Sequence, residues 1–268
     1  MISKNDRINS SYYNVENMGD DDTNSEYSAY GKYTIDTSLE LIFPKTKIKI
    51  NKIGENVFSY EKLDAEDNIV EKIIPTFSSV LTLEITPIRP LNHPARRTNY
   101  LYLDIGSPIF LSSGSSADVF VNCPIEIGVF LINGETHESL DWFTCNPNDS
   151  RFCLYGSPES GTLCKYAHSE IVESHDSSIP YINGVMKINL KNDLSRGLTI
   201  SKLVFPITEH SLYYKDTKAI FDTLTTILKK KLTLEIFDGH PLPIQTDWTI
   251  SPTYERAEHN KAIDMGVD

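Results

Sequence analysis

Short segments in which apolar and polar residues alternate recur along most of the chain. The alternation is clearest in residues 47–50, 81–85, 100–104 and 232–236, where every second residue is apolar. This period places one side of a strand in a core and the other side in water, as in antiparallel sheets. Turn residues separate such segments at intervals of ~8 to 12 residues, a spacing typical of sandwiches and barrels. We therefore predict a mainly β protein with an antiparallel β-sandwich-like architecture, built as one large unit or two smaller ones.

One segment, residues 216–230, departs from the strand pattern. Its apolar residues follow helical spacing: Ile220, Phe221, Leu224, Ile227 and Leu228. Asp216 precedes them as a candidate N-cap, and the lysines at the far end suit the C-terminus of a helix. The threonine and isoleucine content of the same segment favours a strand. We predict a helix here, with a strand as the alternative.

The strand pattern is interrupted in mid-chain by residues 133–151, which are rich in Asn, Gly, Pro and Asp. Because such residues mark turns and boundaries, we predict an N-terminal β unit over residues 29–135 and a C-terminal β unit over residues 150–250. Residues 1–28 carry an acidic cluster without periodicity, and we expect a disordered tail there. Residues 251–268 also lack a clear period and are expected to form a second tail.

The balance of charge argues against two classes of partner. The chain has 25 Lys and Arg residues against 37 Asp and Glu residues, which gives a formal net charge of −12. An acidic surface repels the phosphates of nucleic acids and the head groups of anionic membranes. No stretch reaches the ~18 apolar residues needed to cross a bilayer, and the first residues contain no apolar signal segment. We expect a cytoplasmic protein that binds neither nucleic acid nor membrane and whose partner is a protein. The sequence leaves its oligomeric state open.

Three cysteines and one histidine raise the question of a zinc site: Cys145, Cys153, Cys164 and His168. A Cys₃His site needs four ligands that converge on one ion. The ten residues between Cys153 and Cys164 include Gly156, Pro158 and Gly161. These three residues are typical of a turn between two strands. We therefore predict a β-hairpin with the two cysteines as cross-strand neighbours, and keep a zinc-stabilised module as an alternative.

An irregular basic loop is the first candidate for a ligand site. Its basic residues are Arg89, His93, Arg96 and Arg97. Arginine side chains bind carboxylates and phosphates through paired hydrogen bonds, so we predict that this loop binds an anionic ligand or an acidic partner. Glu126 is a second candidate, because a carboxylate buried among apolar neighbours often marks a functional site. Strict alternation predicts instead that Glu126 faces water, on the side opposite Ile125 and Ile127.

Two motifs of the chain resemble those of a known family. Residues 124–129 form the segment Pro-Ile-Glu-Ile-Gly-Val, and the second motif consists of Tyr155, Gly156, Pro158, Gly161, Cys164, Lys165 and Tyr166. With these motifs the chain resembles the archaeal family catalogued as domain of unknown function 432, over roughly residues 30–250. The resemblance implies no known activity, substrate or cofactor, so no functional residue follows from it.

No local arrangement of residues marks a catalytic centre, a phosphate-binding loop or a cofactor site. We therefore assign no catalytic residue and expect no cofactor. The leading hypothesis is a non-catalytic binding or interaction module of the cytoplasm. A hydrolase whose site is assembled from residues distant in sequence is the main alternative, because sandwich enzymes often leave no local motif.

Overall fold

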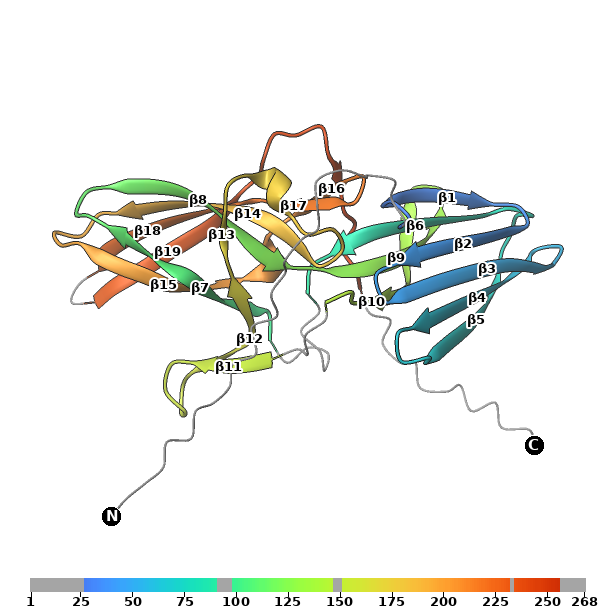
Figure 1. The fold of residues 1–268 in the computed structure, drawn as a ribbon, viewed down its shortest axis with the longest axis horizontal. Helices are drawn as coiled ribbons and strands as arrows, with labels where there is room; N and C mark the ends of the chain where they lie inside the picture. The colour runs from blue at the N-terminus through green and yellow to red at the C-terminus, as the bar shows by residue number, and fades with distance from the viewer. Residues whose placement is uncertain (1–26, 91–97, 147–150, 232–233, 256–268) are drawn as a thin grey trace, which may run out of the picture.

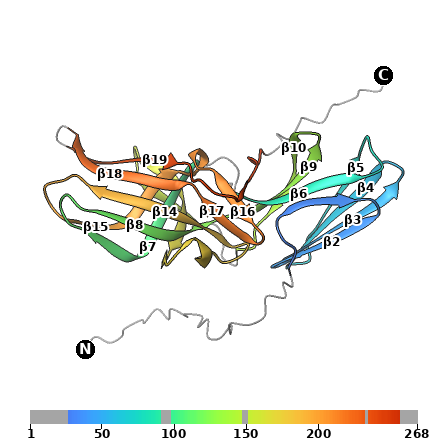
Figure 2. The ribbon, with the colours of Figure 1, turned by 90° about the horizontal axis from the view of Figure 1, so that it is seen from above.

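Two β-sandwiches account for most of the described chain (Figure 1). The computed structural model describes residues 27–90, 98–146, 151–231 and 234–255. In Figure 1 and Figure 2 alike, the sandwiches lie end to end along the long axis and meet near its middle. Buried apolar side chains form two separate clusters, one for each sandwich. The predicted mainly β, sandwich-like architecture is thus confirmed.

The first sandwich packs two four-stranded antiparallel sheets against each other. One sheet is a meander of β2 (Ser38–Phe43), β3 (Thr46–Gly54), β4 (Val57–Asp64) and β5 (Ile69–Pro75). The other has the order β1-β6-β9-β10 and consists of β1 (Gly31–Ile35), β6 (Leu81–Ile88), β9 (Glu126–Asn133) and β10 (Thr136–Phe143). Alternation sets the faces of these strands, since Ile48 and Ile50 of β3 and Phe58 of β4 are fully buried.

The second sandwich is larger and mixes parallel with antiparallel pairing. One sheet has the order β11-β12-β7-β15, with β7 (Tyr100–Leu111), β11 (Arg151–Tyr155), β12 (Thr162–Ser169) and β15 (Leu198–Pro206). The other consists of β8 (Ser116–Pro124), β13 (Ile171–Val172), β14 (Asn183–Asn192), β16 (Leu212–Lys215), β17 (Lys218–Phe221), β18 (Thr223–Lys231), β19 (Leu234–Leu242) and β20 (Thr249–Ile250). The parallel pairs are β12 with β7, and β14 with both β17 and β18.

The strands of each sandwich are not consecutive in sequence. After β6 the chain forms β7 and β8 of the second sandwich, and then returns to the first with β9 and β10. Only Ile125 separates β8 from β9, so one nearly continuous extended segment crosses between the sandwiches (Figure 1). The sheets therefore divide the chain differently from the expected units 29–135 and 150–250. The interruption after β9 is a tight hairpin turn, with Gly134 at a φ of 62° and β10 paired to β9.

Aromatic rings and a buried hydrogen bond join the sandwiches at their junction, which we call the seam. The ring of Tyr30, which precedes β1, contacts the rings of Tyr181 and Tyr214 at centroid distances of 5.2 and 5.8 Å. The hydroxyl of Tyr214 on β16 donates to Oε1 of Glu84 on β6 over 2.7 Å. Glu84 is almost fully buried. These contacts connect residues far apart in sequence and should couple the stabilities of the two sandwiches.

The two expected tails lie largely outside the described residues. Residues 1–26 and 256–268 are not described. Residues 251–255 follow β20 and return to the first sandwich, where the ring of Tyr254 packs against that of Phe130 with centroids 5.7 Å apart. This short segment is thus part of the packed structure.

The predicted helix at residues 216–230 is wrong. The segment forms β17 and β18, and β18 pairs with β14 on one side and β19 on the other. Leu224 is buried in the second core, and the hydroxyl of Thr226 donates to the carbonyl of Asn189. Pairing on both sides, together with the preference of Thr and Ile for strands, outweighs the helical spacing. Helical structure in the described residues is limited to the 3₁₀ turns η2 (His175–Ser177) and η3 (Ile207–Glu209), and neither approaches the length of a membrane span.

Candidate functional site

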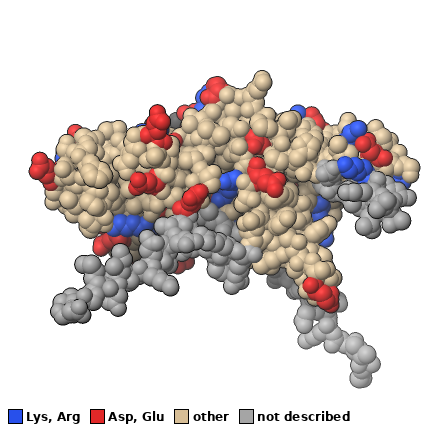
Figure 3. Space-filling model, turned by 180° about the vertical axis from the view of Figure 1, so that it is seen from behind, with Lys and Arg blue, Asp and Glu red and all other residues tan. Residues whose placement is uncertain are grey.

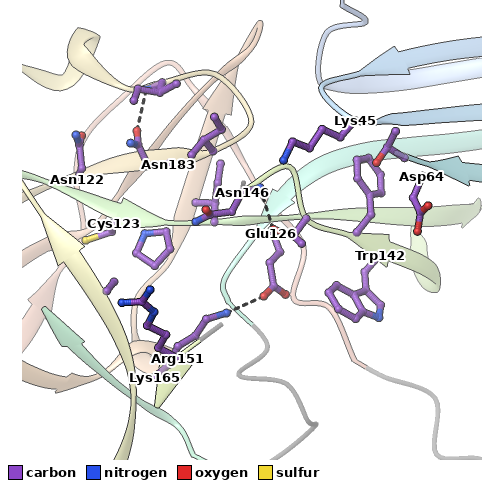
Figure 4. Close-up of a pocket in the computed structure, with 18 of the residues that line it drawn as sticks. Lys45, Asp64, Asn122, Cys123, Glu126, Trp142, Asn146, Arg151, Lys165 and Asn183 are labelled. Atoms are coloured by element: carbon purple, nitrogen blue, oxygen red, sulfur yellow. Dashed lines mark hydrogen bonds and ion pairs between the residues drawn. The ribbon is translucent and has the colours of Figure 1, made fainter. Parts of the chain in front are cut away.

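A pocket of about 900 Å³, which we call the cleft, lies at the seam (Figure 4). The turns after β2 and β4 and the end of β10 form the wall on the side of the first sandwich. The β8–β9 crossing contributes the residues between the walls. The start of β11, the middle of β12 and residues 179–183 form the wall on the side of the second sandwich. The topology explains this position, because the ends of two sandwiches face each other across a single extended segment.

A buried ion pair connects the crossing segment to the second wall. Lys165 on β12 lies 2.9 Å from Oε1 of Glu126, the first residue of β9 (Figure 4). Glu126 is 4% exposed and Lys165 is 7% exposed, so the expectation that Glu126 faces water is wrong. Alternation fails at this point because the strand is covered on both sides where it passes between the sandwiches. Pairing with Lys165 offsets much of the cost of removing the carboxylate from water.

Two further cations reach the cleft without being neutralised. Lys45 belongs to the β2–β3 turn, where its φ is 63°, and Arg151 begins β11. Within the described parts of the chain, neither side chain has a hydrogen-bond or ion-pair partner. In Figure 4, Lys45 extends from the first wall, whereas Arg151 lies beside Lys165 on the opposite side. Acidic and basic side chains are interspersed on the face seen in Figure 3.

The other charged residues of the first wall are already engaged. Lys62 forms an ion pair with Oδ2 of Asp141 over 2.8 Å and donates to the carbonyl of Trp142. Asp64 accepts hydrogen bonds from the side chain and the backbone N–H of Asn68, which shape the β4–β5 turn. The hydrogen bond from the Asn68 side chain holds the pKa of Asp64 below its usual value. The carboxylate of Asp64 is therefore stabilised in its ionised form, and its turn holds it in position.

The second wall contains the hairpin that the sequence predicted. Strands β11 and β12 flank residues 156–161, and Cys153 lies directly opposite Cys164 in the register. Two positions along the register from this pair, Arg151 lies opposite Tyr166. The hydroxyl of Tyr166 donates to Oδ2 of Asp104 over 2.7 Å, and this bond raises the pKa of Tyr166 to about 12. The hairpin prediction is confirmed.

The alternative of a zinc site at this hairpin is wrong. Cys145 is buried in the core of the first sandwich, away from the strand pair that carries Cys153 and Cys164. Nε2 of His168 instead lies 2.7 Å from Oε1 of Glu170. All four proposed ligands are described, and no group of three or more His, Cys, Asp or Glu residues in the described chain is placed to hold a metal ion. Burial also raises the pKa of Cys164 to about 11, which disfavours the thiolate that zinc requires.

The predicted basic-loop site is only partly described. His93, Arg96 and Arg97 lie outside the described residues. The guanidinium of Arg89 donates to the carbonyl of His210 over 3.2 Å and to Oγ1 of Thr253 over 3.1 Å. Burial lowers the pKa of Arg89. Arg89 thus ties the segment after β20 to the seam and does not line the cleft.

One comparison with known proteins places the chain in a family. A family model described as "Protein of unknown function (DUF432)" matches residues 29–265. The chain belongs to the DUF432 family. No curated protein and no solved structure matches it. Membership therefore supports the resemblance seen in the sequence but assigns this DUF432 protein no activity.

The structure brings two of the candidate residues into the cleft, Glu126 and His168, together with residues that the sequence did not point to. Lys45 lies in the β2–β3 turn, Trp142 near the end of β10 and Arg151 at the start of β11. Lys165 was visible only as the lysine of the Cys-Lys-Tyr motif. Its burial, opposite fully buried Leu101 in the register, became visible only in the structure, because alternation from Cys164 points Lys165 to the other face of the strand.

Proposed function

We propose that this DUF432 protein is a binding module that holds a small anionic molecule, carrying a carboxylate or a phosphate, in the cleft. The observation that carries this proposal is the pair of unneutralised cations, Lys45 and Arg151, on opposite walls of one cavity (Figure 4). Lysine and arginine bind carboxylates and phosphates through charge-assisted hydrogen bonds. Lys165 lies beside Arg151 and contributes a third positive charge, which Glu126 balances.

The size and lining of the cleft support a small ligand. A volume of about 900 Å³ falls in the range of pockets that hold small molecules. Half-buried Trp142 adds an aromatic surface to a lining that is otherwise rich in polar groups. Such a mixture of an apolar face and a few placed polar groups is typical of ligand sites.

The carboxylates of the cleft favour binding over hydrolysis. A general base needs a free lone pair within reach of the proton that it removes. Glu126 is held by Lys165, and Asp64 is held by hydrogen bonds within its own turn. Glu66, the third carboxylate of the lining, accepts from the side chain of Asn68 in the same turn. These constraints support the non-catalytic hypothesis over the hydrolase alternative.

Isothermal titration calorimetry with three probes, citrate, inorganic phosphate and adenosine monophosphate, tests this proposal. We expect at least one probe to bind the wild-type protein, with an affinity that decreases as salt is added. Lys45→Met and Arg151→Met should each weaken binding by about tenfold, because each removes one charge-assisted hydrogen bond.

Lys49→Met is the matched control. Lys49 lies on the outward side of the same sheet as the Lys45 turn, opposite Glu40 and Glu61, and does not line the cleft. Binding of the same probe should be unchanged in this variant. If no probe binds, or if Lys49→Met weakens binding as much as Arg151→Met does, the proposal is wrong.

A further inference from the structure

The β11–β12 hairpin carries a second chemical feature, a pair of facing thiols. Cys153 and Cys164 are direct cross-strand partners, and both are free thiols. Residues directly opposite each other in an antiparallel pair have Cα atoms about 4.5 to 5.5 Å apart and side chains on the same face. A disulfide requires Cα atoms about 4.4 to 6.8 Å apart. The register therefore places the two Cα atoms in the range of separations that a disulfide spans.

We infer that Cys153 and Cys164 form a redox modification site, at which a low-molecular-weight disulfide such as oxidised glutathione converts the two thiols into an intramolecular disulfide. The inference rests on the hairpin register and does not depend on what the cleft binds. The remaining thiols are separated from this site, since Cys123 and Cys145 are buried in the two different cores.

The unequal exposure of the two thiols sets the order of the reaction. Cys153 is partly exposed, whereas Cys164 is fully buried beneath its neighbours. Burial, together with Asp104, raises the pKa of Cys153, and nearby Lys202 offsets only part of this rise. Cys153 is therefore the thiol that an external disulfide reaches first, and the reaction should be faster at alkaline pH.

The exchange takes place in two steps. The Cys153 thiolate attacks one sulfur of oxidised glutathione, which forms a mixed disulfide and releases one glutathione thiolate. The Cys164 thiolate then attacks Sγ of Cys153, which forms the Cys153–Cys164 bond and releases the second glutathione. The two protons lost by the cysteines go to the two released thiolates. The two cysteines lose two electrons, and the oxidised glutathione gains them.

The disulfide would fasten the edge of one sheet. β11 lies at the end of the order β11-β12-β7-β15 and pairs only with β12 among the described strands. Edge strands of this kind open more easily than central strands. A bond from Cys153 to Cys164 would hold β11 in place, and with it Arg151, which lies two residues before Cys153 on the same strand and lines the cleft.

Peptide mass spectrometry of the full-length protein tests the inference. Trypsin cleaves after Arg151 and Lys165, so one peptide, residues 152–165, contains both Cys153 and Cys164. Cys123 and Cys145 fall in a different peptide, residues 98–151. After incubation with oxidised glutathione at about pH 8.5, blocking of free thiols and digestion, peptide 152–165 should be lighter than its reduced form by two hydrogen atoms. Peptide 98–151 should retain two blocked thiols.

Two variants test the order of attack. Cys164→Ala should accumulate a glutathione adduct on Cys153, whereas Cys153→Ala should give no adduct, because Cys164 is inaccessible. In the oxidised wild type, amide hydrogen exchange in residues 151–155 should slow by about tenfold. A wild-type peptide that keeps both thiols, or keeps an unresolved glutathione adduct, would overturn the inference. No ligand is used in these measurements, so their failure is distinct from a failure of the binding proposal.

Discussion

The two sandwiches are built in different ways from the same kind of strand. In the first sandwich every pair is antiparallel, and the meander β2–β5 joins strands that follow each other along the chain. The second sandwich contains three parallel pairs and unites strands from residues 100–124 with strands after residue 150. Local pattern therefore determines much of the first sandwich, whereas the second depends on contacts that only the complete fold supplies. The seam between the sandwiches contains the buried ion pair of Glu126 and Lys165.

The largest expected effect concerns this seam. Glu126→Gln leaves Lys165 buried without its counter-charge, so we expect the free energy of unfolding to fall by about 3–5 kcal/mol. Urea denaturation, followed separately by probes in each sandwich, measures the loss. The double variant Glu126→Leu/Lys165→Met removes both charges and should recover most of the stability. A loss below about 1 kcal/mol in the single variant would mean that water reaches the pair.

A second prediction asks whether the sandwiches unfold together. Leu83 and Leu103 are fully buried in the first and second cores, respectively. Replacing either by Ala should cost about 3 kcal/mol, because each substitution leaves a cavity. Since the seam contacts couple the cores, both variants should shift one common calorimetric transition. Two transitions, of which each variant shifts only one, would show that the seam does not couple the sandwiches.

A third prediction concerns how the stability of the protein depends on pH through the buried side chain of His210. Burial lowers the pKa of His210, which is 1% exposed, to about 4, and Arg89 adds to the effect while Asp222 opposes it. The unfolded chain therefore binds a proton near pH 6.5, whereas the folded protein does not. Stability from this source is complete above pH 6.5 and falls by about 2–3 kcal/mol as the pH approaches 4.

His210→Gln should lack this part of the acid sensitivity, which is measured as the difference in unfolding free energy between pH 7 and pH 4.5. His240→Gln, at an exposed position, serves as the control and should follow the wild type. Parallel pH profiles for wild type and His210→Gln would contradict the buried, neutral state of His210.

The smallest expected effect comes from an ion pair outside the seam. Glu40 and Lys47 lie 2.6 Å apart on the outer face of the first sandwich, with side chains 45% and 37% exposed. Water and salt screen such pairs, so Glu40→Gln should change the free energy of unfolding by less than about 0.5 kcal/mol. Comparison with Glu126→Gln under the same conditions shows how far burial alone determines the importance of a charge pair. Equal losses in the two variants would contradict the description of the seam as buried.

The sequence predicted the parts of the fold that short-range pattern controls. Alternation placed Ile48 and Ile50 in a core, and turn chemistry placed Cys153 opposite Cys164. Sequence pattern failed at Leu224. There the helical spacing is overruled by strand pairing with β14, which lies far away in sequence, and with β19. It failed also at Glu126, where the strand leaves one sandwich for the other and no side of it faces water.

The cleft was beyond prediction for a related reason. Nothing in the sequence around Lys45 or Arg151 distinguishes these residues from ordinary surface cations. Their significance comes from the topology, which returns β9 to the first sandwich and so brings the ends of the two sandwiches together. The charge pattern of the sequence could indicate an anion-binding role only for basic residues that are close together along the chain.

The most direct test of the proposed cleft uses the two tryptophans of the chain. Trp142 lines the cleft and Trp248 does not. In ¹H–¹⁵N spectra of the labelled protein, titrated in turn with citrate, phosphate and adenosine monophosphate, the indole signal of Trp142 should shift and that of Trp248 should stay fixed. The shift should be lost in the Lys45→Met/Arg151→Met double variant. A probe that binds by calorimetry but leaves the Trp142 signal unmoved would place the ligand elsewhere and contradict the proposal.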